Sequence, residues 1–317
     1  MAVLPDAGGG KTYALLIEPL RHYENLDFGG VIFRRNMTQI KKEGSLWDTS
    51  ELIYPLFDGL PTQSQSFWKF PSGMKMAFSH LESEKSLLNW QGSQVAFFGF
   101  DELTHFTKKQ FFYMISRLRS GSGVPGYIRA TCNPDANSWV KQFIQWWLDK
   151  ETGFAIPERD GVLRYFIRQE DKIVWGDSRE ELREKYGEGE DPMSVTFIKS
   201  SVYDNKIMLE KNPRYLSSLK SLDRVERARL LDGNWNIVPA AGVYFKKHEF
   251  PIMEVAPAEI EFIEKVRCWD RAATEVNASN EDKINPDWTV GCKMGALKDG
   301  RFIVLDVVRD RLSTLNV

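Results

Sequence analysis

A glycine-rich loop that ends in Lys-Thr stands close to the first residue of the chain and reads Ala7-Gly8-Gly9-Gly10-Lys11-Thr12. Glycines carry no Cβ atom, so the backbone N–H groups of such a loop can come close to a phosphate. Lys11 can reach the β- and γ-phosphates of a nucleotide, and the Thr12 hydroxyl can bind Mg²⁺. A helix that begins at Lys11 would point its positive end toward the same anion. The loop therefore predicts a nucleotide phosphate site at the start of a helix.

An apolar run that ends in an acidic pair forms the second half of this pattern. Val95–Phe100 is short and apolar, and Asp101 and Glu102 follow it directly. Such a run predicts a buried strand. In a nucleotide-hydrolysing site, Asp101 would support the metal ion and Glu102 would orient the attacking water. Each half alone is also typical of a plain loop or an ordinary strand end. Both halves in this order favour an ATP site that uses Mg²⁺.

The composition is that of an ordinary globular protein of about two domains. The chain has 317 residues, of which 42% are hydrophobic. No stretch approaches the ~20 apolar residues that span a membrane, and no secretory signal is visible. Three well-separated cysteines, Cys132, Cys268 and Cys292, indicate a reducing compartment rather than a disulfide framework or a zinc site. The net charge of −2 gives no support to a generally basic nucleic-acid binder, but it permits a local basic surface.

Strands and helices alternate through the first part of the chain, which predicts an α/β fold with a mostly parallel sheet and helices on both faces. The expected strands are Val31–Phe33, Val95–Phe100 and Tyr127–Thr131, the expected helices are Lys108–Leu118 and Ser138–Leu148, and Phe67–Phe78 is expected to be a hairpin.

The pattern changes after about residue 160. The expected elements there are a hairpin of Leu163–Ile167 with Lys172–Trp175, helices at Glu180–Tyr186 and Arg214–Leu231, and a strand at Ser194–Ser200. Pro239–Gly242 is the expected linker to a second domain. Beyond it, three apolar runs separated by turn-rich segments predict a three-stranded meander. These runs are Val266–Trp269, Trp288–Met294 and Phe302–Val308.

Basic and polar residues at the ends of these elements are secondary candidates. Arg34 and Arg35 end an expected strand on the carboxyl side, where they could contact phosphate or DNA, or form ordinary surface. Arg117 or Arg119 could be an arginine finger that stabilises charge on the γ-phosphate. Both could equally complement a helix dipole. Thr131 and Asn133 could sense the γ-phosphate from a strand tip, or belong to a turn that ends at Pro134.

Acidic residues in the second domain offer a weaker signal. Asp270 follows the run Val266–Trp269, and a carboxylate at a strand end could hold a divalent metal for phosphodiester hydrolysis. One acid cannot hold two metals, and the further acids in the meander are Asp287, Asp306 and Asp310. On the residues alone, surface carboxylates are the more common interpretation of such acids.

With these residues in view, the chain resembles the large terminase subunit of tailed bacteriophages, the motor that packages DNA into the capsid. Gly8–Leu15 is similar to the Walker A segment of that family, and Trp90–Phe106 to its Walker B region. The further matching segments are Ser116–Arg119, Ala130–Pro134, Leu231–Trp235, Arg267–Ala273 and Asp287–Gly291. Together these motifs extend over nearly the whole chain.

The resemblance implies an ASCE-type P-loop NTPase domain over 1–239, with a small lid subdomain over about 160–239. Residues 240–317 would then be the first part of an RNase H-like nuclease domain. ATP and Mg²⁺ are the implied cofactors, and Asp270 and Asp287 would bind Mg²⁺ or Mn²⁺ in the nuclease. The implied partners are double-stranded DNA, a portal protein and a small terminase subunit, with the chain in a homo-oligomeric ring in the host cytoplasm.

The ends of the sequence lead to one more expectation and to two rival functions. The family has further carboxylates beyond the meander, so the chain is expected to be a fragment without DNA cleavage of its own. One rival function is a P-loop ATPase of another class, such as a helicase or a partition ATPase. The other is a non-catalytic terminase remnant that binds DNA or a partner without turnover.

Overall fold

The structure is a computed structural model that describes residues 2–4, 9–169, 172–238, 251–255, 257–270 and 288–310. The chain divides into two compact units, Met1–Pro239 and Ala240–Val317. Each unit is described by itself. None of the helices in the described residues has the length and apolar character that crossing a membrane requires.

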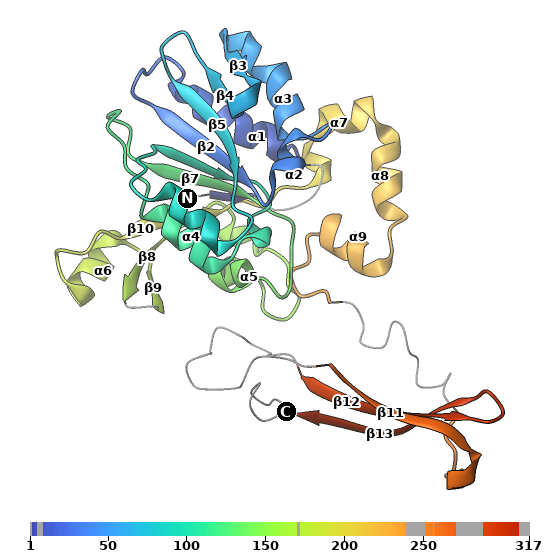
Figure 1. Cartoon of the computed structure of the whole chain (residues 1–317). Coiled ribbons are helices and arrows are strands. Elements are labelled where there is room, and N and C mark those ends of the chain that lie inside the picture. The colour runs from blue at the N-terminus through green and yellow to red at the C-terminus, as the bar shows by residue number, and fades with distance from the viewer. Residues whose placement is uncertain are drawn as a thin grey trace. The chain divides into compact units, whose positions relative to one another are not determined.

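The first unit contains a ten-stranded sheet in the order β3-β4-β5-β2-β6-β7-β1-β10-β8-β9 (Figure 1). The six central strands, from β5 to β10 in this order, are parallel to one another. Antiparallel hairpins extend both edges. The strands are β1 Ala2–Leu4, β2 Gly29–Arg34, β3 Leu60–Thr62, β4 Phe67–Lys69, β5 Lys75–His80, β6 Phe97–Phe100, β7 Tyr127–Thr131, β8 Leu163–Gln169, β9 Lys172–Gly176 and β10 Met193–Phe197. The expected mixed α/β fold with a mostly parallel sheet is confirmed.

Helices cover both faces of this sheet, because successive side chains of a strand point to opposite faces. Ile32 of β2 packs with Leu16 of α1 and Trp47 of α3 on one face. Phe33 packs with Phe111 of α4 on the other. The helices are α1 Lys11–Ile17, α2 Met37–Lys41, α3 Leu46–Ile53, α4 Lys108–Ile115, α5 Trp139–Phe143, α6 Arg179–Tyr186, α7 Lys206–Lys211, α8 Pro213–Lys220 and α9 Arg224–Leu230.

One glycine of β6 allows α1 to approach the sheet closely. A Cβ atom at Gly99 would lie 2.9 Å from Cγ1 of Ile32 and 3.2 Å from Cδ1 of Leu15. Real Cβ atoms rarely come so close, so a larger residue would push α1 away from β6. Because Lys11 begins α1 and Asp101 follows β6, Gly99 helps to set the distance between the two halves of the expected nucleotide site.

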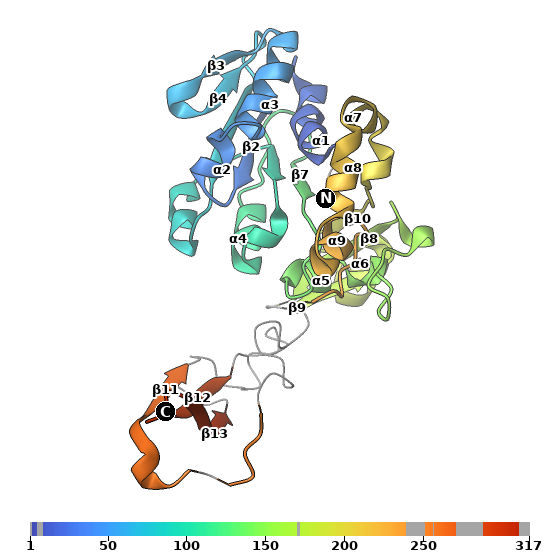
Figure 2. The ribbon, with the colours of Figure 1, turned by 90° about the vertical axis from the view of Figure 1, so that its right-hand side faces the viewer.

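The segment expected to form a lid, about 160–239, divides between the sheet and a helical part. β10 pairs in parallel with β1, and the β8–β9 hairpin continues the sheet beyond β10. Val195 and Phe197 of β10 are buried in the main core, which explains why this segment joins the sheet. The helices α7, α8 and α9 instead form a separate group (Figure 2), with a small core of Val202, Leu219 and Leu231.

The second unit is an antiparallel meander of β11 Phe262–Asp270, β12 Thr289–Leu297 and β13 Phe302–Asp310. β12 lies in the middle and pairs with both neighbours, which confirms the three-stranded meander expected from the sequence.

Candidate nucleotide-binding site

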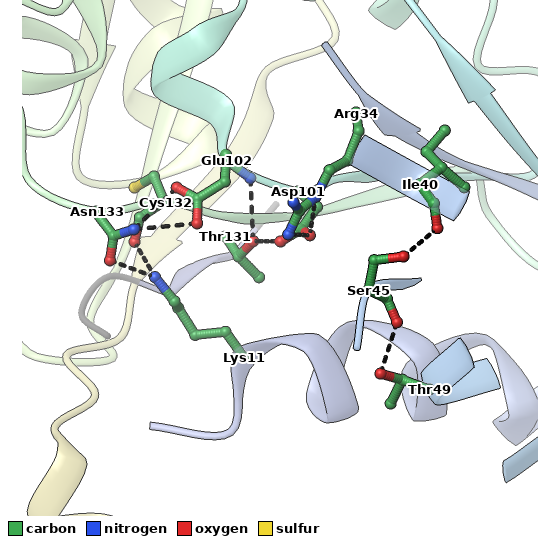
Figure 3. Close-up of polar contacts among 10 residues, drawn as sticks. All are labelled: Lys11, Arg34, Ile40, Ser45, Thr49, Asp101, Glu102, Thr131, Cys132 and Asn133. Carbon is green, nitrogen blue, oxygen red and sulfur yellow. Dashed lines mark hydrogen bonds and ion pairs between the residues drawn. The ribbon is translucent and has the colours of Figure 1, made fainter. Parts of the chain in front are cut away.

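Four elements bring polar side chains to the carboxyl edge of the parallel sheet. β6 lies between β2 and β7, and β7 also pairs with β1. Since the strands are parallel, Arg34, Asp101 and Thr131 all stand at strand ends on one edge, and the loop after β1 leads there to Lys11. Ligands of open α/β sheets bind at this edge. Figure 3 shows these side chains together.

The Asn133 side chain connects Lys11 to Glu102. Nζ of Lys11 donates hydrogen bonds to Oδ1 of Asn133 at 2.8 Å and to the carbonyl oxygen of Cys132 at 2.6 Å. Nδ2 of Asn133 donates to both carboxylate oxygens of Glu102, at 3.0 and 3.1 Å (Figure 3). A lysine can only donate and an ionised carboxylate can only accept, so the amide can take only this orientation. The expected phosphate-binding lysine and water-orienting glutamate are therefore held in one network.

Asp101 is buried, with 2% of its surface exposed, and both of its oxygens are hydrogen-bonded. Oδ1 accepts from the Thr131 hydroxyl at 2.5 Å. Oδ2 accepts from Nε of Arg34 at 2.6 Å and forms an ion pair with a second guanidinium nitrogen at 2.5 Å. A buried charge needs such pairing, since an isolated ionised carboxylate in the interior costs far more free energy.

The backbone of Glu102 is in the left-handed region, with φ 60° and ψ 60°. A residue other than glycine costs on the order of 1–3 kcal/mol in such a conformation, and the surrounding contacts must hold it there. The amide nitrogen of Glu102 donates to Oγ1 of Thr131 at 3.3 Å, while Asn133 holds the side chain. Backbone strain of this kind is concentrated at functional sites, which agrees with a working role for Glu102.

The described part of the glycine-rich loop requires its glycines. Gly10 caps α1 with φ 81°, a left-handed conformation that favours glycine. A Cβ atom at Gly9 would lie only 2.8 Å from Oγ of Ser200, in the segment between β10 and α7. Thr12 is half-buried in the first turn of α1. Gly8 lies outside the described residues.

The residues at this edge fit a magnesium ion that is held mainly by nucleotide phosphates. The Thr12 hydroxyl and the Asp101 carboxylate are oxygen donors, which Mg²⁺ prefers, and the ion commonly keeps only one or two protein carboxylates. Among the described residues, no group of three or more His, Cys, Asp or Glu side chains could hold a metal ion. The Asp101 charge is also already balanced by Arg34.

Arg117 and Arg119 lie near the amino ends of the parallel strands, whereas this network lies at their carboxyl ends. Their backbones hydrogen-bond to Val95, which precedes β6, whereas Asp101 follows β6. The extended chain from Val95 to Asp101 spans about 20 Å. The structure therefore does not bring either arginine to the Glu102 of its own chain. A finger role for Arg117 or Arg119 stays a prediction that requires a neighbouring copy.

The candidate acids that the structure describes in the second unit do not all lie on one face. Asp270 is the exposed last residue of β11 and is paired in register with Val290. Asp306 is in register with Lys293, itself paired with Arg267, and forms an ion pair with Arg267. Because facing rows alternate between the two sides of a sheet, Asp306 lies on the face opposite to Asp270.

The prediction that Asp306 could bind a metal ion together with Asp270 is therefore wrong. The register of Thr289 with Asp310 places Asp310 on the same face as Asp306. Asp287 lies outside the described residues. A metal role for Asp270 stays a prediction.

Sequence reasoning missed two contacts at the carboxyl edge. The sequence did not decide whether Arg34 contacts phosphate, DNA or solvent. In the structure, Arg34 forms an ion pair with Asp101. Sequence reasoning also overlooked the Cys132 carbonyl that accepts from Lys11. The basic pair at a strand end signalled Arg34, but nothing in the residue types indicates which main-chain carbonyl a lysine will reach.

A family model for the terminase large subunit, T4likevirus-type, N-terminal, matches residues 7–252, which is more than half of the chain. The chain belongs to the large terminase subunit family. The resemblance drawn from the sequence motifs is thereby confirmed.

Solved structures of large terminases match the chain at low sequence identity and with TM-scores below 0.5. The large terminase of the thermophilic bacteriophage D6E in complex with ADP is 12% identical, with a TM-score of 0.48 over 98% of this chain and 63% of that one. The ATPase domain of the Thermus phage P74-26 large terminase is 9% identical, with a TM-score of 0.43 over 74% of this chain and 87% of that one. The HK97 bacteriophage large terminase is 16% identical, with a TM-score of 0.39 over 98% of this chain and 58% of that one.

This terminase chain thus spans less than two thirds of the length of the D6E and HK97 proteins. No curated protein matches it by sequence.

Proposed function

We propose that this terminase chain binds ATP at the carboxyl edge of its sheet and hydrolyses it to drive the packaging of viral DNA. The observation that carries the proposal is the continuous contact from Lys11 through Asn133 to Glu102. This contact links the residue type that binds β- and γ-phosphates to the residue type that positions an attacking water. The P-loop NTPase assignment, with its ASCE-type order of motifs, rests on the same residues.

Each residue of the network has a distinct role in this proposal. The glycines of the loop present backbone N–H groups to the phosphates, and Lys11 neutralises the charge of the β- and γ-phosphates. Thr12 and Asp101 would hold Mg²⁺, which supplies charge stabilisation at the phosphates when bound. Glu102 orients the attacking water and accepts its proton. Asn133 holds the Glu102 carboxylate and senses whether Lys11 is engaged by phosphate, while Thr131 fixes Asp101 and the Glu102 backbone.

The packaging role comes from the family and extends the proposal to partners. Double-stranded DNA, a portal protein and a small terminase subunit are the proposed partners, and a ring of identical chains is the proposed assembly. In such a ring, Arg117 or Arg119 of one copy would act on the nucleotide of the next. The second unit would be the first part of an RNase H-like nuclease with Asp270 as a metal ligand.

Nucleotide binding and turnover in two variants test the proposal. Glu102→Gln keeps the shape of the side chain but removes the base, so ATP binding should persist while hydrolysis falls by at least about 10²-fold. Lys11→Ala should weaken binding itself, because the phosphates lose their cation. Lys42→Ala and Glu43→Gln, at exposed neighbouring positions, are matched controls that should change neither quantity.

The outcomes separate the proposed motor from its rivals. Absence of ATP binding in the wild-type chain would indicate a non-catalytic remnant. Equal loss of binding in Glu102→Gln and Lys11→Ala would contradict the division of roles. ATP-dependent DNA uptake into capsids that carry a portal would distinguish a packaging motor from a helicase or a partition ATPase.

A further inference from the structure

Only one of the two arginines at the end of β2, Arg34 and Arg35, faces the nucleotide site. Arg34 contributes both Nε and a terminal nitrogen to Oδ2 of Asp101, at 2.6 and 2.5 Å. Arg35 instead donates to the Leu81 carbonyl at 3.4 Å and to Oε1 of Gln110 at 3.3 Å. Arg35 is therefore a matched control for Arg34, because it is the same residue type at the same strand end but has different partners.

The Arg34 ion pair satisfies the carboxylate oxygen that a metal ion would need. Each carboxylate oxygen has about two acceptor positions, and both positions of Oδ2 are taken by the guanidinium. Oδ1 accepts from Thr131, which leaves one acceptor position on the whole group. The Asp101 side chain is 2% exposed, so water cannot easily replace a lost partner, while the Arg34 side chain is 17% exposed.

We propose that Arg34 and Mg²⁺ exchange at Asp101, so that binding of Mg²⁺ with a nucleotide releases the Arg34 guanidinium to the phosphates. Both cations neutralise the same buried carboxylate, and two positive charges at one oxygen repel each other. The released guanidinium stands at the sheet edge where phosphates bind, and its planar donors match phosphate oxygens. Arg34 is thus a positioning residue that competes with Mg²⁺ for Asp101, and the loss of its ion pair reduces the gain in nucleotide affinity that Mg²⁺ provides. The second half of this inference rests on the proposed nucleotide site.

The exchange can be measured as the effect of Mg²⁺ on ADP affinity, without any turnover. In the wild-type chain, Mg²⁺ must displace Arg34, so the ratio of ADP dissociation constants in EDTA and in Mg²⁺ should be modest. In Arg34→Gln, Asp101 is left with an unbalanced charge that the ion can neutralise. The ratio should then rise by at least about tenfold, within the range of ordinary coupling between two ligands. Asp101→Asn should bring the ratio close to one, and Arg35→Gln should leave it at the wild-type value.

Thermal unfolding without nucleotide tests the exchange independently of the nucleotide site. Arg34→Gln should lower the unfolding midpoint in EDTA, because one partner of a buried ion pair remains alone. Excess Mg²⁺ should restore part of this loss in Arg34→Gln but have little effect on the wild-type chain. The double variant Arg34→Gln with Asp101→Asn should fold and be insensitive to Mg²⁺, because neither charge remains. Arg34→Lys keeps the charge, so it should show a Mg²⁺ response closer to that of the wild type.

Each result supports or overturns the exchange. An unchanged or smaller ADP ratio in Arg34→Gln would overturn it, as would equal Mg²⁺ effects on unfolding in Arg34→Gln and the wild type. If the wild-type chain binds no ADP, the proposed nucleotide site fails, and the unfolding measurement alone decides the exchange.

Discussion

Lys11 and Glu102 are linked by a single side chain, that of Asn133, whose amide oxygen faces the cation and whose amide nitrogen faces the carboxylate. Two groups of opposite charge that are 91 positions apart in the sequence therefore share one neutral bridge. An amide can do this because it has a donor and an acceptor on one rigid plane. Occupation of Lys11 by phosphate would remove one partner of Asn133 and leave the other, which gives the nucleotide a direct route to the position of Glu102.

Replacement of Asn133 by Asp tests this bridge. The new carboxylate would keep Lys11 as an ion pair but face the Glu102 carboxylate at the present amide distance of 3.0 Å. Like charges at such a distance repel, so Glu102 should leave its position. We expect weaker ATP binding, because Lys11 is retained by the new charge, and a larger loss of hydrolysis. Parallel titrations and turnover assays would measure both effects.

The matched control for that variant is Asn137→Asp, which adds the same charge at an exposed position a few residues away. An Asn133→Asp variant with wild-type hydrolysis would show that the amide bridge does not matter for turnover.

Thr131 allows a second test, since its hydroxyl serves both acidic residues. It donates to Asp101 and accepts from the amide of Glu102, and the residue is fully buried. Thr131→Val keeps the shape but leaves the buried carboxylate without this donor. We expect a loss of about 1.5–3 kcal/mol in the free energy of unfolding, the range for a hydrogen bond to a charged group. Urea denaturation would measure the loss.

The Thr131→Ser variant keeps the hydroxyl and should retain most of the stability and turnover. If Thr131→Val lost no more stability than Thr131→Ser, the hydrogen bond from the hydroxyl to Asp101 would not account for the loss.

The sequence was sufficient to predict which strand ends bring polar side chains together, because the two motifs stand at fixed places in an alternating α/β pattern. Asp101 follows an apolar run that predicts a buried strand, Thr131 ends another such run, and parallel strands bring their ends together. The partner of Arg34 could not be predicted, since β2 and β6 are neighbours only through the strand order of the sheet. The left-handed backbone of Glu102 was equally hidden, because it depends on contacts with Thr131 and Asn133 from another strand.

The prediction of a lid subdomain over about residues 160–239 shows a different limit of what local sequence can indicate. β10 is short, and nothing within its own residues decides between a local hairpin and a place in the large sheet. Its pairing with β1 joins residues 2–3 to residues 196–197, a contact between distant segments that local periodicity cannot indicate. Asp306 was misplaced for a related reason: the side of a sheet on which a residue lies depends on strand register, and one position of shift reverses it.

Arg119 lies far from the nucleotide site of its own chain, and this leads to a third prediction. Its side chain is exposed and its backbone pairs with Val95 at the amino edge of the sheet. We expect Arg119→Ala to leave ADP affinity within about twofold of the wild type, the usual range for surface changes. Turnover by dilute, monomeric protein should also be unchanged. A calorimetric titration under conditions where light scattering shows a monomer would check this.

A loss of turnover that appears only when copies assemble would support a finger that acts on a neighbouring chain. Weaker ADP binding by monomeric Arg119→Ala would contradict the position of Arg119 in the structure.

The last prediction concerns metal binding by the second unit. Asp270 and Asp306 lie on opposite faces of the β11–β13 meander, and Asp306 is paired with Arg267. Two carboxylates can share metal ions only if they converge, with paired ions about 3.5–4 Å apart. We therefore expect Asp306→Asn to leave Mn²⁺ affinity unchanged in a titration followed by electron paramagnetic resonance. Any Mn²⁺ site of this unit should instead be lost in Asp270→Asn. The Arg267 ion pair is partly exposed, so Asp306→Asn should cost at most about 1 kcal/mol of stability, and both variants should remain folded. Parallel loss of Mn²⁺ binding in the two variants would require Asp306 to reach the face of Asp270, and would show that the strand register between β12 and β13 is wrong.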